Sequence, residues 1–236
     1  RILCASDPRL MERIEVASLD KLAARLSKHM QINNLIPDKF ELFKVLENTL
    51  DKNDYSNIGS SRFIINEWME VVDAWQITNW ESYRDFKRLG RKIRLTETKR
   101  KQLWEIFVKF ELVIHHKGWM TRAAQLKKLA EEYLESKRAP YDFIVVDEAQ
   151  DITPMQLNFV GAVASQGKDN LFFTGDLGQR IFQTPFSWAS LGVEIRGRSH
   201  SLKINYRTSH QIRRQADRLL NNIISDVDGN EEDRSG

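Results

Sequence analysis

The sequence contains a single cysteine, Cys4, among 236 residues, so no disulfide can form within the chain. A protein without disulfides is typical of a reducing compartment, and we expect a cytoplasmic location. No apolar run approaches the length of about 18 residues that predicts a membrane-spanning helix. The first residues lack both the layout of a secretory signal and an initiator Met, so we expect the chain to begin inside a larger protein.

An excess of charge of one sign is also lacking, because 36 Lys and Arg oppose 33 Asp and Glu, for a net charge of +3. The charges are unevenly distributed, however. Residues 84–138 contain 16 Lys or Arg and only 7 Asp or Glu. A basic block of this kind attracts polyanions such as nucleic acid. The alternative is a solvated helical face without a partner.

Most of the sequence between residues 12 and 137 has the hydrophobic rhythm of helices. Residues 12–26 read as a short strand followed by a helix, with Ser18 or Asp20 as its N-cap. Residues 27–137 are expected to be almost wholly helical. The helices predicted there cover residues 39–50, 63–75, 80–89, 98–116 and 121–137.

The pattern changes after Ala139-Pro140. Phe143 to Val146 is an unalternating apolar run, which is typical of a strand buried on both faces of a parallel sheet. Further elements are predicted in the order helix, strand, strand, helix, over residues 153–164, 171–174, 201–204 and 209–224. The alternation of strands and helices predicts an α/β layer that carries a large helical insertion.

Acidic side chains follow two of the predicted strands at the point where each strand ends. The first strand ends at Asp147 and Glu148, and the second ends at Gly175 and Asp176. Ligands of α/β sheets bind at the carboxyl ends of the strands. One carboxylate there can hold Mg²⁺ beside a nucleotide phosphate while its neighbour polarises an attacking water. The alternative is that both acids cap the following helix.

Three polar or aromatic side chains farther along the chain suit the same chemistry. Gln179 has a neutral amide that can contact a γ-phosphate, or it is simply a surface residue. Tyr206 offers a ring for stacking on a base, and Arg207 offers a planar fork for phosphate oxygens. The alternative for the arginine is a structural salt bridge.

Aromatic residues gather just beyond the second acidic strand end, at Phe182, Phe186 and Trp188. Aromatic faces often hold single-stranded nucleic acid by stacking on its bases. Packing under a loop is the alternative for each of them.

Three sequence segments that follow one another along the chain make the resemblance to a known family specific. They are VVDEAQD (residues 145–151), FTGDLGQRIF (173–182) and LKINYRTSHQI (202–212). They resemble motifs II, III and IV of superfamily 1 helicases of the UvrD/Rep type, and IEVASLDKLA (14–23) resembles motif Ib. The resemblance implies a RecA-like P-loop NTPase core with a helical 1B-like insertion. Its implied division is domain 1A in 1–26 and 138–201, the insertion in 27–137, and the start of domain 2A in 202–236.

The resemblance also implies roles at the first strand end. Asp147 would bind Mg²⁺ and Glu148 would activate water. Gln150 and Asp151 would couple the site to neighbouring motifs, and Gln150 and Asp176 would be among the residues that bind the ATP cofactor.

Roles for the remaining candidates follow from the same resemblance. Gln179 would contact the γ-phosphate, Tyr206 would stack on the adenine, and Arg207 would act as an arginine finger. The expected nucleic-acid contacts are Ser18, Asp20, Phe186 or Trp188, and the basic residues Arg91, Lys92 and Arg94.

Some motifs of the family pattern are absent from this sequence. The sequence has no GxxxxGK[ST] phosphate loop, and its one Gly-Lys pair, Gly167-Lys168, is followed by Asp169. Motifs V and VI are also absent. We therefore expect an internal segment of an ATP-dependent, 3′-to-5′ DNA helicase that is inactive alone. Its partners would be DNA and the rest of the helicase chain. The alternative is a non-catalytic module that binds nucleic acid or a protein partner through a helicase-like fold.

Overall fold

The computed structural model describes most of the chain, in two compact units formed by residues 1–34 and 35–236. The described residues are 8–50, 58–88, 94–165, 167, 169–176, 186–193, 198, 200, 202, 209–217, 223–225 and 231–233. Within them no helix is long and apolar enough to cross a membrane.

The described residues of the first unit form two helices, α1 (Pro8–Arg13) and α2 (Leu19–His29). Ser18 is the N-cap of α2, as predicted, and its hydroxyl accepts a hydrogen bond from the N–H of Lys21 at 3.4 Å. Asp20 lies in the first turn of α2, where a negative charge favours the helix dipole. The strand expected before this helix is wrong. Residues 14–18 form no strand, because no described segment supplies a partner for its backbone hydrogen bonds.

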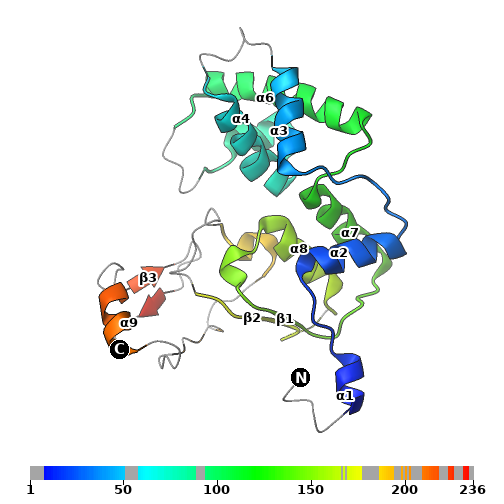
Figure 1. Ribbon diagram of the computed structural model, residues 1–236, viewed down its shortest axis with the longest axis vertical. Helices are drawn as coiled ribbons and strands as arrows, with labels where there is room; N and C mark the ends of the chain where they lie inside the picture. Colours follow the sequence, from blue (N-terminus) through cyan, green and yellow to red (C-terminus); the bar gives the residue numbers. More distant parts are fainter. Residues whose placement is uncertain are drawn as a thin grey trace. The chain divides into compact units, whose positions relative to one another are not determined.

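The next elements form a helical core, as the sequence predicted. They are α3 (Lys39–Thr49), α4 (Ser61–Glu67), η2 (Trp68–Asp73), α5 (Trp80–Asp85) and α6 (Glu97–His116). Figure 1 shows α3, α4 and α6 lying against one another. Their facing side chains are fully buried, including Leu46, Ile64, Phe107 and Phe110. Asp38 begins α3 with a capping box, in which its side chain and that of Glu41 bond reciprocally to backbone N–H groups.

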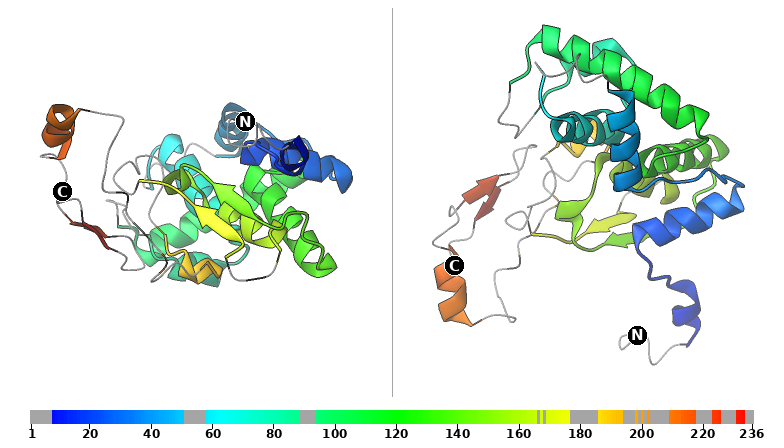
Figure 2. Two further views of the ribbon diagram at one scale, coloured as in Figure 1. Left: turned by 90° about the horizontal axis from the view of Figure 1, so that it is seen from below. Right: turned by 45° about the horizontal axis from the view of Figure 1, so that its top comes forward.

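A small parallel sheet follows this helical core. Strand β1 (Ile144–Val146) pairs with β2 (Leu171–Phe173), and Val145 lies opposite Phe172. Helix α7 (Arg122–Ser136) packs against α8 (Pro154–Val163), and α8 covers one face of the sheet in both sets of views (Figures 1 and 2). Thr153 caps α8, and Pro154 occupies its first turn as predicted.

The expectation that β1 is buried on both faces is wrong. Val145 is 70% exposed and Phe172 is 61% exposed, whereas their neighbours along each strand are half-buried. The physical reason is that α8 covers only one face of this two-stranded sheet. The sheet therefore presents an apolar face, to which Phe143 also contributes.

The remaining elements are short. They are η3 (Ala149–Asp151), η5 (Ala189–Leu191), α9 (His210–Asp217), β3 (Ile223–Ser225) and β4 (Glu231–Asp233). The helix predicted over 209–224 is wrong at its end, because residues 223–224 belong to β3, which pairs antiparallel with β4. Of the strand expected over 201–204, only Leu202 is described, and it has no regular structure. The described protein is thus mostly helical with a small parallel sheet.

Candidate active site

Backbone hydrogen bonds extend the parallel pairing beyond the ends of both strands. The N–H of Thr174 donates to the carbonyl of Val146, and the N–H of Ala149 donates to the carbonyl of Thr174, each at 2.8 Å. The segment that leaves β2 therefore lies directly beside the turn that leaves β1. This arrangement brings together four of the predicted site residues, Asp147, Glu148, Gln150 and Asp176.

Asp147 is exposed, and one of its two carboxylate oxygens is held in place. Its Oδ1 accepts hydrogen bonds from the hydroxyl of Thr174 at 2.5 Å and from the N–H of Glu148 at 3.0 Å. The Thr174 bond, followed by the Glu148 bond, lowers the pKa of Asp147 below its ordinary value. Asp147 is therefore a carboxylate at neutral pH, with one oxygen fixed by the protein.

Glu148 has a backbone conformation that residues other than glycine seldom adopt. Its φ of 54° and ψ of 40° lie in the left-handed region, which costs roughly 1 kcal/mol for a residue with a Cβ. Its Oε2 accepts a hydrogen bond from Nε2 of Gln150 at 2.6 Å. The strained turn thus directs Glu148 toward a buried amide that holds one of its oxygens.

Gln150 also reaches the second strand end. Its Oε1 accepts a hydrogen bond from the N–H of Asp176 at 3.1 Å, so one side chain bridges Glu148 and the exit of β2. Gly175 permits this close approach. A Cβ on Gly175 would lie 2.6 Å from Gln150 Oε1, 3.1 Å from the backbone N of Gln150 and 3.2 Å from that of Ala149.

Comparisons with known proteins identify a family to which the chain is similar. The model of the UvrD/REP helicase N-terminal domain family matches residues 11–188, which include both strand ends. The chain belongs to this family. A curated relative is a subunit of an ATP-dependent helicase/nuclease from Lactobacillus johnsonii (strain CNCM I-12250 / La1 / NCC 533). It is 29% identical over 105 residues, a match that covers 41% of this chain and only 8% of the relative.

UvrD/REP helicases use ATP and Mg²⁺, and the first strand end suits such a metal ion. Carboxylate oxygens are ligands that Mg²⁺ prefers, and it is commonly bound by one or two carboxylates together with phosphates. Among the described residues, no hydrogen bond reaches Asp147 Oδ2 or Glu148 Oε1, so each acid keeps one oxygen open. The described part of the chain contains no cluster of three or more His, Cys, Asp or Glu side chains, so phosphate oxygens would have to complete the coordination.

The two candidate base-stacking residues of this helicase segment are buried. Phe186 is 7% exposed and packs edge-on against Trp75, with ring centroids 5.7 Å apart. Trp188 is 9% exposed and packs against Phe173 at 4.8 Å. Both side chains therefore contact other aromatic rings. To stack on a base, Phe186 or Trp188 would have to move away from its aromatic neighbour.

Several cations of the basic block are already bound within the protein. Arg88 forms a buried, bidentate ion pair with Glu67, with N–O distances of 2.9 and 2.7 Å. Arg100 donates to the backbone carbonyls of residues 83, 84 and 86. Arg84 pairs with Asp85 on the surface.

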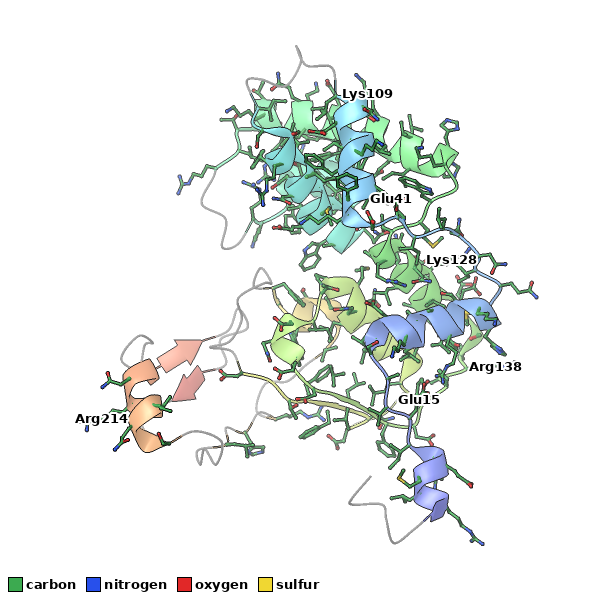
Figure 3. All side chains as sticks on the ribbon, in the orientation of Figure 1. Glu15, Glu41, Lys109, Lys128, Arg138 and Arg214 are labelled. Carbon is green, nitrogen blue, oxygen red and sulfur yellow. The ribbon has the colours of Figure 1, made fainter. Side chains whose placement is uncertain are left out.

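The exposed cations of this block are the ones available to a polyanion. Figure 3 labels three of them, Lys109 on α6, Lys128 on α7 and Arg138 beyond it. Arg94, a predicted contact, is also exposed. Arg91 and Lys92 lie outside the described residues, as do Gln179, Tyr206 and Arg207.

Sequence reasoning missed the parts of Thr174 and Gly175 in this site. Both precede Asp176 in the motif III segment, and a hydroxyl followed by a glycine at a strand end is the sequence signal that could have indicated them.

Asp151 has one buried carboxylate oxygen, Oδ1, without a hydrogen-bond donor among the described residues.

Proposed function

We propose that this chain supplies part of the ATP-hydrolysis site of a DNA helicase that moves along single-stranded DNA, in the 3′-to-5′ direction that the resemblance implies. The observation that supports this most is the joined end of the two parallel strands. There, Asp147 and Glu148 each have one oxygen held by the protein and one left open. A purely structural cap would not need two adjacent open carboxylate oxygens.

In this proposal the two acids divide the work. Asp147 would hold Mg²⁺, for which its Oδ2 is the open oxygen, and the ion would offset the negative charge of the ATP phosphates. Glu148 accepts a proton from the attacking water at Oε1, while Gln150 keeps the other oxygen in place. Gln150 and Asp151 couple these acids to neighbouring segments, and the bridge from Gln150 to Asp176 supports that role.

The remaining roles are proposed from the family pattern. Gln179 contacts the γ-phosphate, Tyr206 stacks on adenine, and Arg207 places its positive charge on the transferred phosphate. Asp176 belongs to the nucleotide-binding residues through its contact with Gln150.

We propose further that the phosphate-binding loop belongs to another part of the parent helicase. The sequence has no GxxxxGK[ST], and the curated relative is much longer than this chain. In this organisation residues 1–26 and 138–201 belong to a RecA-like domain 1A, residues 27–137 form the 1B-like insertion, and residues 202–236 begin domain 2A. The exposed apolar face around Val145 and Phe172 then packs on the rest of the helicase chain.

Glu148→Gln tests the enzymatic part of the proposal in the complete helicase. We expect ATP binding to persist and DNA-stimulated hydrolysis to fall by about 10² to 10⁴, because a positioned base is removed. Glu132→Gln, an exposed acid on α7, is the matched control and should leave the rate unchanged. Equal rates for Glu148→Gln and the parent protein would favour a non-catalytic binding module.

The isolated 236-residue chain offers a second test. We expect little ATP binding and no hydrolysis, because no lysine loop holds the phosphates. Robust DNA-stimulated hydrolysis by this chain, abolished by Glu148→Gln, would show that it is a complete ATPase and contradict the proposed division of the site.

The basic block is proposed to contact DNA through its exposed cations. Affinity for single-stranded DNA should then fall steeply with salt concentration, because bound phosphates release counterions. Replacing Arg91, Lys92 and Arg94 together by Gln should reduce the slope of log K against log salt by about 2. A flat salt dependence, or an unchanged slope in the triple variant, contradicts this assignment.

A triple variant of matched charge controls for net charge alone. Lys28, Lys39 and Lys44 are exposed cations outside the basic block, and their replacement by Gln should leave the slope nearly unchanged.

The other proposed DNA contacts carry specific requirements. Ser18 already accepts a backbone hydrogen bond as the N-cap of α2, so a phosphate would share that helix end with it. Asp20 in the same turn would repel a phosphate. Phe186 or Trp188 would have to leave its aromatic contacts before it could stack on a base.

A further inference from the structure

Thr174 carries a hydroxyl that none of the roles above uses. The main chain of this residue is fixed on both sides, because its N–H bonds to Val146 and its carbonyl bonds to Ala149, each at 2.8 Å. These two bonds lie on either side of Asp147 and Glu148, in the turn that leaves β1. They set the hydroxyl of Thr174 beside the carboxylate, with 2.5 Å between Thr174 Oγ1 and Asp147 Oδ1.

We propose that Thr174 is a positioning residue for the metal-binding carboxylate, an inference that rests on the proposed function of Asp147. An ionised carboxylate only accepts hydrogen bonds, so the hydroxyl must donate to Oδ1. The N–H of Glu148 donates to the same oxygen. With Oδ1 occupied twice, Oδ2 is the oxygen that faces a divalent cation.

This arrangement fixes the orientation of Asp147 before any ligand arrives. An exposed aspartate without such donors samples several rotamers, and a metal ion must then restrict it on binding. Partners that orient a metal ligand typically change metal affinity by about 10- to 100-fold. Because Asp147 is exposed to solvent, we expect the lower end of that range for the loss of the Thr174 hydroxyl.

The test is a Mn²⁺ titration of the complete helicase with a non-hydrolysable ATP analogue present, so that phosphate oxygens can complete the coordination. Electron paramagnetic resonance measures the free ion. Thr174→Val removes the hydroxyl at nearly constant volume and should weaken Mn²⁺ binding by about tenfold. Thr174→Ser retains the hydroxyl and should bind nearly as the parent helicase does. Asp147→Asn should abolish the same binding component.

A matched control comes from Thr49 in α3. Its hydroxyl donates to the carbonyl of Val45 at 2.8 Å, away from any acid of the site. Thr49→Val should leave Mn²⁺ binding unchanged. Urea unfolding of every variant checks that the fold persists, and the serine variant decides the matter if Thr174→Val proves unstable.

The outcomes separate the inference from the function on which it rests. Parent-like Mn²⁺ binding by Thr174→Val, with binding lost in Asp147→Asn, overturns the role of Thr174 alone. Equally weak binding by Thr174→Ser and Thr174→Val also overturns it, because the hydroxyl would then have no part. Protein-dependent binding that survives Asp147→Asn, or none in the parent helicase with the analogue present, overturns the metal role of Asp147 itself.

Discussion

Gly175→Ala is a sharp test of how the two strand ends fit together. The added Cβ would lie 2.6 Å from Oε1 of Gln150, a distance that real Cβ contacts essentially never show. Rotation of the Gln150 side chain could relieve that contact. It would not relieve the distances of 3.1 and 3.2 Å to the backbone nitrogens of Gln150 and Ala149, which are tighter than most real contacts.

The expected magnitude follows from what must move. If Gln150 rotates away, two hydrogen bonds are lost, one to Glu148 and one from Asp176. Each contributes about 0.5 to 1.5 kcal/mol to the free energy of unfolding. If the backbone moves instead, overpacking typically costs about 1 to 3 kcal/mol. Both routes predict a loss of about 1 to 3 kcal/mol for Gly175→Ala.

Urea unfolding followed by circular dichroism measures this loss, and Gly161→Ala is the matched control. Gly161 lies inside α8, and an added Cβ there meets no atom within 4 Å. Because alanine is the better helix former, this control should gain about 0.5 to 1 kcal/mol. A Gly175→Ala chain as stable as the parent would refute the close approach on which this reasoning depends.

Three further predictions concern stability. Arg88→Ala should lower the free energy of unfolding by about 3 to 5 kcal/mol, because it removes the bidentate counter-ion of the buried Glu67 carboxylate; Arg84→Ala, at an exposed pair, should change it by less than about 0.5 kcal/mol. Burial raises the pKa of Asp73 from 3.8 to about 7. Stability should therefore fall by up to about 4 kcal/mol as pH rises between those values, and Asp73→Asn should remove that dependence. Val145→Thr and Phe172→Thr should each cost less than about 0.5 kcal/mol in this chain, but about 1.5 to 3 kcal/mol in a complete helicase.

Each of these has a result that contradicts it. Equal losses for the two arginine variants would mean that the buried pair is no stronger than the surface pair. For the acid, the sign is decisive: a carboxyl with a raised pKa keeps its proton in the folded state, so a stability that rises from about pH 4 to about pH 7 through Asp73 excludes the burial argument. A large cost of the threonine variants in the isolated chain would mean that the sheet face is covered there.

The acids of the site were predictable from sequence, whereas their supports were not. An apolar run followed by Asp147 and Glu148 indicates a strand end with carboxylates, and strand ends of one sheet lie together. The role of Thr174 depends on the register between two strands, because Thr174 and the Asp147 side chain that it contacts are 27 positions apart in the sequence. Gly175 depends on how closely the second strand end approaches a short helical turn. Register and close approach are tertiary properties, which local patterns do not specify.

The same limit applies to the aromatic and basic residues. A cluster of rings in the sequence cannot show whether they stack on one another or face solvent, and Phe186 and Trp188 are buried against other rings. In the basic block, Arg88 is neutralised by Glu67, a residue 21 positions earlier. The net charge counts buried and exposed cations equally, but only the exposed cations can release counterions from DNA.

The apolar face of the sheet connects the sequence pattern to the proposed function. Val145 and Phe172 lie opposite each other in register, so their exposed side chains form one patch rather than two scattered positions. The pattern of β1 is typical of a strand with a layer on both faces, and the described residues supply a layer on one. If the rest of a helicase chain packs on the other face, as proposed, it also reduces the solvent around the strand ends. Lower solvent exposure strengthens the attraction between Asp147 and a cation, so Mn²⁺ affinity should be higher in the complete helicase than in this chain.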